Sequence, residues 1–363
     1  MRGPGEIAAA LRSLAEPSAL ATLVRTKGSS YRKPGARMVF HPGGLQQGGI
    51  SAGCMETDVK ERVAAVLESR HPLLVTFDLG SEIDLIWGTG MGCAGRAEVL
   101  LERMEPGQVP PWLEHAERLA RERGSGLLAT VFGTRGEVPA APGDRFLFEG
   151  DRSLLPAPPA LEAALRTPPA HAEARTARLE GGEVDLLLEP IRPPVALWVF
   201  GAGEHAMPLF RLAKGLGWFL GLADHRPGLA TAARFPEANR IVVGHPPDSL
   251  QAIPFDARTA ALVVSHVYEA DKAALAAFLK APLGYVGLQG NRRRSERILR
   301  ELEEEDGPLT EEARSLLHYP AGLDIGAESP ELIALSMISE VQASLAGRPG
   351  LPLRQWQGPI HPR

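Results

Sequence analysis

The sequence has only two cysteines in 363 residues, Cys54 and Cys93, and they lie far apart with no C-x-x-C pairing. Two isolated cysteines cannot form the disulfide framework of a small secreted domain, and they supply no paired ligands for zinc. We therefore expect neither a disulfide scaffold nor a structural zinc site.

Long apolar runs are also missing, since none approaches the ~20 residues that a membrane-spanning helix requires. The N-terminal segment MRGPGEIAAALRSLAEPS carries Glu6 and Glu16 and breaks at Pro17. A signal peptide instead needs an uninterrupted apolar core after a basic start. We interpret this segment as the amphipathic first helix of a cytoplasmic protein without a membrane span.

Positive charge is not in excess, because the formal net charge is −5, and nucleic acid is therefore not an expected partner. Positive charge is nevertheless concentrated in one segment, RTKGSSYRKPGAR, whose basic residues are Arg25, Lys27, Arg32, Lys33 and Arg37. This local concentration favours the binding of a small anion.

The length predicts two domains, because ~150 residues per domain is the usual expectation. In residues 1–192 short apolar runs alternate with helices, which predicts an α/β domain with a mixed sheet. Prolines in the turn PIRPPV mark the boundary. In residues 193–363 strands and helices alternate regularly, which is typical of a Rossmann-like, doubly wound parallel sheet. We find no internal repeat.

The segment VFGAGEHAMPLFRLAKGLGWFLGLADHRP has the spacing of a dinucleotide-binding fingerprint. Gly201 ends a strand, Gly203 allows a close approach of the backbone, and Asp224 ends the next strand. A phosphate would then lie at the helix N-terminus, Asp224 would bind a ribose hydroxyl, and Arg226 could pair with an extra phosphate. Alternatively, the glycines only allow the helix to pack closely on its strand.

The glycine loop is expected to lie in a crevice at the carboxyl ends of the parallel strands, and this crevice is also expected to contain His266. In the usual strand order, Gly201 and the pair Ser265 and His266 lie on opposite sides of the switch point of the sheet. His266 is then a candidate ligand contact, and the alternative is that it only caps a strand end.

Both cysteines lie in glycine-rich segments, GGISAGCME and GTGMGCAGR. Cys54 directly precedes a predicted helix, and a helix N-terminus lowers the pKa of a thiol. Glu56 and Asp58 in the first turn oppose this effect, so we expect the basic segment 25–37 to face Cys54. The alternative for each cysteine is an inert buried thiol.

Taken together, these motifs resemble the XdhC/CoxI family of accessory proteins for xanthine dehydrogenase and carbon monoxide dehydrogenase. The N-terminal likeness is in GSSYRKPGARMVF, GGISAGCMETDV and GTGMGCAGRAEVLLE. The C-terminal likeness is in VFGAGEHAMPLFRLAKGLGW, VVSHVYEAD, GYVGLQGNRRR and GLDIGAESPELIALSMISEV. The resemblance covers nearly the whole chain.

The resemblance implies a chaperone that holds molybdenum cofactor, protects it during sulfuration and delivers it to an apo-molybdoenzyme. The family's cysteine in GGC-x-E corresponds to Cys54, although Ala52 replaces the middle glycine. Cys54 would contact the metal of molybdopterin or its cytosine dinucleotide. The residues expected to bind the cofactor are Cys54, Cys93, Arg37, Gly201, Gly203, Asp224 and His266. A cysteine desulfurase and a second copy of the chain in a homodimer are further expected partners.

Two other functions stay open at this point. The Rossmann-like domain suits an NAD(P)-dependent oxidoreductase, with substrate bound by the first domain. Cys54 and Cys93 could instead be partners in a thiol-based redox sensor. No Ser-His-Asp set, acid pair or zinc ligand set indicates catalysis, so a non-enzymatic role is favoured.

Two structural expectations complete the sequence-based picture. The cysteine loops and the Gly201 and His266 strand ends are expected to form a cleft between the domains. A helix is expected to begin with Ser329 as N-cap and to cover the sheet with Leu332, Leu335, Met337, Ile338 and Val341. Asp324, in the preceding turn, would orient Arg292 or Arg293, contact a ligand, or cap its own turn.

Overall fold

The computed structural model describes residues 3–28, 31–41, 43–44, 46–53, 55–78, 95–165, 167–251, 253–355 and 357. The chain forms two compact units, Met1–Pro193 and Pro194–Arg363. Cys54 and Cys93 lie outside the described residues. The predictions for their surroundings therefore stay predictions.

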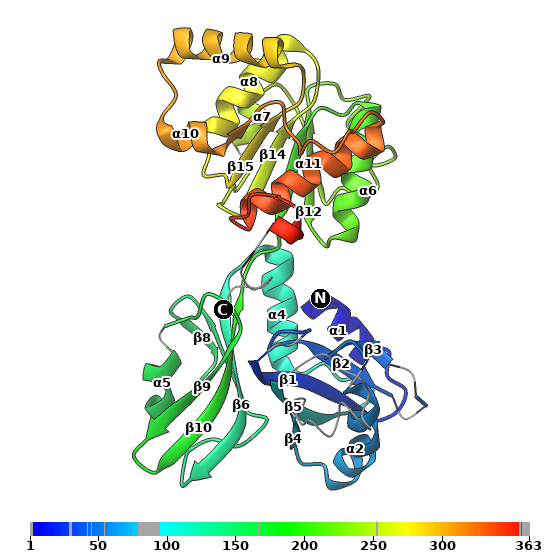
Figure 1. Cartoon of the computed structure of the whole chain (residues 1–363), viewed down its shortest axis with the longest axis vertical. Coiled ribbons are helices and arrows are strands. Elements are labelled where there is room, and N and C mark those ends of the chain that lie inside the picture. Colours follow the sequence, from blue (N-terminus) through cyan, green and yellow to red (C-terminus); the bar gives the residue numbers. More distant parts are fainter. Residues whose placement is uncertain are drawn as a thin grey trace. The chain divides into compact units, whose positions relative to one another are not determined.

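The described part of the first unit contains two sheets and several helices (Figure 1). In chain order its elements are α1 (Pro4–Arg12), β1 (Ser18–Gly28), β2 (Arg37–Phe40), β3 (Gln46–Gly48), α2 (Glu56–Ser69), β4 (Leu73–Asp78), β5 (Gly95–Met104), α4 (Pro111–Glu122), β6 (Gly126–Gly136), β7 (Arg145–Glu149), β8 (Arg152–Leu155), α5 (Pro159–Leu165), β9 (Glu173–Leu179) and β10 (Gly182–Ile191).

The strand order is β3-β2-β1-β5-β4 in the first sheet and β8-β7-β6-β10-β9 in the second. Every strand pair in the described part of this unit is antiparallel. The α/β class is confirmed, but the expectation of one mixed sheet is wrong. Several neighbouring strands are joined by turns too short for the crossover that a parallel pair needs.

The two sheets belong to an internal repeat, contrary to the sequence-based expectation. The first repeat, residues 18–104, and the second repeat, residues 126–191, share the order β-β-β-α-β-β and the same strand order in the sheet. Their sequences match as LATLVRTKG with LATVFGTRG, PGARMVF with PGDRFLF, and GRAEVLLE with GEVDLLLE. The first unit is therefore built from two copies of one motif.

The two repeats contact one another reciprocally. Arg37 of the first repeat binds Glu189 of the second, with Nη1 to Oε1 at 2.8 Å. The equivalent Arg145 of the second repeat binds Glu102 of the first, with Nη1 to Oε1 at 2.9 Å. Both guanidinium groups lie over the ring of Trp112 in α4, at 4.9 and 5.1 Å from its centroid. Exchanged contacts of this kind indicate a local two-fold relationship.

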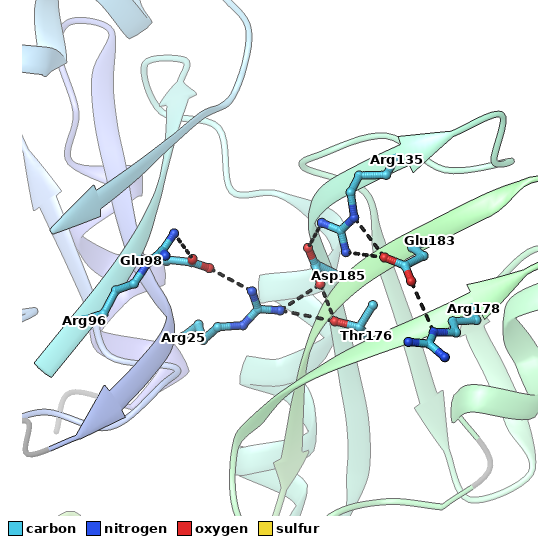
Figure 2. Close-up of polar contacts among 8 residues, drawn as sticks. All are labelled: Arg25, Arg96, Glu98, Arg135, Thr176, Arg178, Glu183 and Asp185. Atoms are coloured by element: carbon cyan, nitrogen blue, oxygen red, sulfur yellow. Dashed lines mark hydrogen bonds and ion pairs between the residues drawn. The ribbon is translucent and has the colours of Figure 1, made fainter. Parts of the chain in front are cut away.

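A second polar network joins the sheets through Arg25 (Figure 2). Its guanidinium donates to Glu98 of β5 at 3.1 Å and to Asp185 of β10 at 2.7 Å. Asp185 also accepts from Arg135 at 2.8 Å. Beside this network, the buried side chains of Val24, Leu100, Phe132 and Leu187 form an apolar cluster. Arg25 is therefore part of the interface between the repeats.

The second unit contains a six-stranded parallel sheet in the described residues, with strand order β13-β12-β11-β14-β15-β16. In chain order its elements are β11 (Ala196–Phe200), η1 (Glu204–Ala206), α6 (Met207–Gly215), β12 (Phe219–Asp224), β13 (Arg240–Val243), α7 (Asp248–Gln251), β14 (Thr259–Val263), α8 (Tyr268–Leu279), β15 (Tyr285–Leu288), α9 (Arg292–Asp306), α10 (Glu311–Leu316), β16 (Leu317–His318), α11 (Pro330–Leu345) and η2 (Leu353–Gln355). The predicted doubly wound Rossmann-like sheet is confirmed.

Both faces of this sheet are covered by helices. Leu197 and Val199 of β11 pack with α6 and α11 on one face. Ala196, Trp198 and Phe200 pack with α8 and α9 on the other face. Burial on both faces explains why the strand ALWVF is apolar without alternation.

Helix α11 begins as predicted, because the Ser329 side chain accepts a hydrogen bond from the amide of Leu332 at 3.3 Å. Its buried face is narrower than expected. Met337, Ile338 and Val341 lie in the core, whereas Leu332 and Leu335 are each 44% exposed. The buried stripe runs through Ala334 with helical spacing, which leaves the two leucines on the outer side.

The turn before α11 is organised by Glu340 and not by Asp324. Glu340 accepts hydrogen bonds from the amide of Gly322 at 2.8 Å and from the Tyr285 hydroxyl at 2.6 Å. Asp324 is exposed, and among the described residues it bonds neither its own turn nor Arg292 or Arg293. Those expected contacts of Asp324 are wrong.

Candidate functional site

The carboxyl edge of the parallel sheet brings Gly201 and Ser265 together, as predicted from the strand order. Gly201 has a φ of +122°, and an added Cβ would lie 2.5 Å from the amide nitrogen of Ser265. Only glycine allows this approach of the loop after β11 to the end of β14. The two strand ends thus meet at the switch point of the sheet.

His205 and His266 lie on the two sides of this switch point. Their ring centroids are 4.7 Å apart, and His205 Nε2 donates to the carbonyl oxygen of Val264 at 2.7 Å. A Cβ at position 203 would lie 2.4 Å from the His205 ring, so Gly203 makes room for that ring. The sequence analysis did not single out His205.

His266 is exposed and has a left-handed backbone with a φ of +60°. Such a conformation is uncommon for a residue with a side chain and is often found at functional sites. Partial desolvation of the imidazole and the nearby His205 lower its pKa from the ordinary value of 6.5. The His266 ring is therefore neutral at pH 7 and can donate or accept a hydrogen bond.

Asp224 is fully buried, and its carboxylate is already engaged. It accepts hydrogen bonds from the amide of Ala202 at 2.6 Å and from Arg226 Nη2 at 2.7 Å. Burial raises the pKa of Asp224, but the Arg226 side chain and the two amides outweigh burial and lower it overall. Asp224 thus fixes the glycine loop to the end of β12, and no oxygen is left exposed for a ribose.

Asp271 supports the other side of the crevice. This fully buried carboxylate accepts from the Ser265 hydroxyl at 2.5 Å and from Arg294 Nη2 at 2.7 Å. Arg294 Nη1 is buried and has no hydrogen-bond partner in the described part of the chain. The sequence analysis had considered Arg292 and Arg293 instead. The signal that the sequence analysis missed is Asp271 itself, an acidic residue in the first turn of α8, the helix that follows β14.

In the first unit, Ser51 and Glu56 form hydrogen bonds among the described residues that flank position 54. The Ser51 hydroxyl accepts from the amides of Gly53 and Met55 at 3.1 and 3.2 Å, and Glu56 accepts from the Ser51 amide at 2.9 Å. Burial raises the pKa of Glu56, but the hydrogen bonds from Ser51 lower it overall. The glutamate of the GGC-x-E motif therefore holds the loop that precedes α2.

Four of the five basic side chains of the segment 25–37 fall into two groups. Arg25 and Arg37 take part in the contacts between the repeats, and the side chain of Arg37 is only 9% exposed. Lys27 and Lys33 are exposed. The structure thus gives Arg37 a role in packing, and its contact with a cofactor stays a prediction.

The described residues contain no cluster of three or more His, Cys, Asp or Glu side chains that could hold a metal ion. In the same residues, no helix is long and apolar enough to cross a membrane.

Comparison with known proteins identifies the family. Residues 197–341 match the XdhC Rossmann domain, and residues 11–78 match the XdhC and CoxI family. A protein of Bacillus subtilis (strain 168) that is named as a probable xanthine dehydrogenase subunit is 31% identical over 340 residues, which are 90% of this chain and 92% of that protein. The chain belongs to the XdhC/CoxI family.

The XdhC Rossmann domain match runs from β11 to α11 and includes Gly201, Asp224 and His266. A crystal structure from Bacillus halodurans, described as a xanthine dehydrogenase, is similar to this chain with a TM-score of 0.75 and 27% identity. The likeness covers 99% of each chain. The resemblance seen in the sequence motifs is confirmed along nearly the whole length.

Proposed function

We propose that this member of the XdhC/CoxI family is a maturation factor for a molybdoenzyme of the xanthine dehydrogenase or carbon monoxide dehydrogenase class. Its cargo is molybdenum cofactor, which it protects and delivers to the apo-enzyme. The observation that carries this proposal is the similarity over 90% of the chain to a protein named as a probable xanthine dehydrogenase subunit.

The carboxyl edge of the parallel sheet suits the phosphate-bearing part of such a cargo. The glycine loop can approach a ligand with its backbone amides, and phosphates commonly bind amides at this position of the fold. Arg294, which shares Asp271 with Ser265, keeps one buried donor, Nη1, without a partner among the described residues. The neutral His266 ring adds a further polar contact. These donors fit an anionic group.

Cys54 is the proposed ligand of the metal, since it corresponds to the cysteine of the family motif. A thiolate is a soft ligand and suits a soft metal-sulfur centre. This role, that of Cys93 and the cleft between the domains rest on the sequence alone. The same holds for the cysteine desulfurase, for the homodimer and for a cytoplasmic location.

An NAD(P)-dependent oxidoreductase is the second candidate, favoured by the strand order and the glycine loop. The buried Asp224 argues against it, because Arg226 and Ala202 already occupy the carboxylate that would bind the ribose. Titration with reduced nicotinamide nucleotides separates the two functions. A maturation factor is expected to show no binding at concentrations where molybdenum cofactor saturates it.

The proposal is tested by titrating the purified chain with molybdenum cofactor in its molybdopterin form and in its cytosine dinucleotide form, followed by pterin fluorescence after oxidation. We expect one of the two forms to bind, and Cys54→Ala to lose molybdenum faster than the wild type. Arg152→Ala, an exposed change in β8, is the control and should not alter metal retention. Absence of binding to either form would contradict the proposal.

A further inference from the structure

Helices α1 and α4 lie side by side in the first unit (Figure 1), and a cavity of about 380 Å³ opens between them, the start of β2 and the end of β10. Most of its wall is apolar and includes Pro4, Ile7, Trp112, Leu113 and Ile191. Cavities of ~300–1,000 Å³ with apolar walls and a few polar groups are the usual binding sites of small molecules. The cavity therefore has the size and the lining of a small-molecule site.

The second repeat shows that the fold does not require this cavity. Matched positions of the two repeats differ by 108, as in the pair Arg37 and Arg145. The same offset makes Trp112 of α4 the equivalent of Pro4 of α1. The indole of Trp112 packs against Arg145 of its own repeat, with its centroid 5.1 Å from the guanidinium carbon, whereas Pro4 lines the cavity together with Arg37. Proline is smaller than tryptophan, and space remains beside Arg37.

A second replacement by a smaller residue widens the cavity. Pro72 and Ala172 directly precede β4 and β9, which are equivalent edge strands of the two sheets. A Cβ added to Gly143 would lie 2.9 Å from Cγ of Pro72, whereas a Cβ added to the equivalent Gly35 would lie 3.7 Å from Cβ of Ala172. Ala172 lines the cavity. The cavity is thus open where the first repeat and its partner strand carry the smaller residue of each equivalent pair.

The cavity also contains polar groups. Arg37 is paired with Glu189, the one acidic residue of the described lining, and Arg37 Nε is buried without a hydrogen-bond partner in the described residues. Arg192 is exposed at the rim and forms no ion pair within the described part of the chain, although Asp151 and Glu162 line a neighbouring cavity with it. Arg192 is therefore a cationic donor that a carboxylate in the cavity can reach.

We propose that this cavity binds a small aromatic acid, with its ring between the apolar walls and its carboxylate at Arg192. The rings of Pro4, Pro34 and Trp112 offer surfaces on which a flat ring packs. The planar guanidinium of Arg192 suits a carboxylate. Because the cavity wall comes from both repeats, the ligand stabilises the contact between them. The site does not rest on the proposed function.

The test is isothermal titration of the full chain with cinnamate at constant ionic strength. Pro4→Trp and Ala172→Pro give the cavity the larger residues of the other equivalent positions, where the fold accepts them. We expect each variant to weaken cinnamate binding at least tenfold. Pro330→Trp makes the same change as Pro4→Trp at the exposed first residue of α11 and should leave the affinity within twofold.

The position of the acid group is tested with Arg192→Gln and with the neutral cinnamamide. Arg192→Gln should weaken cinnamate binding at least fivefold and leave cinnamamide binding within twofold. Equal cinnamate affinity of wild type and Arg192→Gln would overturn the role of Arg192.

The site itself is overturned if the wild type does not bind cinnamate, or if Pro330→Trp weakens binding as much as Pro4→Trp. Circular dichroism checks that each variant is folded. A folded Pro4→Trp and a folded Ala172→Pro that both bind cinnamate as the wild type does would also overturn it. Since a ligand that binds only the folded chain stabilises it, cinnamate should raise the melting temperature of the wild type and not that of Pro4→Trp.

Discussion

Asp271 is the residue on which the switch-point crevice most depends, because it is fully buried and binds both Ser265 and Arg294. Its removal leaves the guanidinium of Arg294 without its only carboxylate in the described residues. We expect Asp271→Ala to lower the free energy of unfolding by about 3 kcal/mol, as when a buried pair loses one partner. The exposed ion pair of Arg297 with Glu301 provides the control, and Arg297→Ala should cost less than about 1 kcal/mol.

Urea unfolding followed by circular dichroism measures both variants. A cost of Asp271→Ala no greater than that of Arg297→Ala would show that Asp271 does not support the crevice.

The lowered pKa of His266 makes the stability of the fold depend on pH. Desolvation and His205 lower its pKa in the folded chain, whereas the unfolded chain keeps a value near 6.5. The unfolded state therefore binds the proton more readily, and stability decreases as pH falls below about 6.5. His266→Asn keeps a residue that tolerates the left-handed backbone and removes this titration.

The variant should thus lose less stability than the wild type between about pH 7.5 and pH 5.5. Urea unfolding at several pH values provides the comparison. His171→Asn, in the first unit, controls for the loss of a histidine elsewhere. An equal pH dependence of wild type and His266→Asn would contradict the lowered pKa.

At the scale of the elements, two reciprocal ion pairs join the repeats, Arg37 with Glu189 and Arg145 with Glu102. We expect these pairs to couple the two repeats energetically. The side chains of Arg145 and Glu102 are only 6% and 9% exposed. Arg145→Met alone should destabilise the chain by about 3 kcal/mol, because Glu102 remains buried and unpaired. The double variant Arg145→Met and Glu102→Leu should recover much of this loss, since paired apolar replacements cost less.

Chemical denaturation of the single and double variants measures this difference. Additive destabilisation in the double variant would mean that the ion pair does not couple the two repeats.

A simpler prediction at the same scale concerns how much the N-cap of α11 contributes to stability. The Ser329 side chain accepts a hydrogen bond from the amide of Leu332, and loss of such an N-cap costs ~1 kcal/mol. Ser329→Ala should lower stability by about that amount in thermal or urea unfolding, whereas Ser329→Asp should retain it. No difference between these two variants would contradict the cap.

The sequence predicted individual elements better than their pairing. The strands of the parallel sheet and the start of α11 were predicted correctly, because apolar runs, glycine turns and an N-cap serine are local signals. The two antiparallel sheets were not, because strand pairing depends on contacts far apart in the sequence. The internal repeat was missed because its shared features, such as PGARMVF and PGDRFLF, are short and separated by segments of different length.

The same distinction applies to the candidate site. The proximity of Gly201 and Ser265 could be predicted from the sequence, because the strand order in this fold is regular. The hydrogen-bonded ion pair between Asp224 and Arg226 could not be predicted, and neither could the one between Arg37 and Glu189. Each of these contacts depends on the direction of a side chain, and for Arg37 on a partner in the other repeat.

At the scale of the whole molecule, the chain combines a duplicated antiparallel unit with a parallel Rossmann sheet, and both units offer cationic or amide donors. A carrier of an anionic cofactor needs such donors. It also has to release its cargo, so binding alone does not establish a maturation role.

The most direct measurement is reconstitution of a purified apo-molybdoenzyme of the xanthine dehydrogenase class with sulfurated molybdenum cofactor, in the presence and absence of this chain. The enzyme is expected to regain activity faster and to a higher level when the cofactor is supplied bound to the chain, and Cys54→Ala should reduce this gain. Equal recovery with free cofactor and with cofactor mixed with the chain would contradict the maturation role.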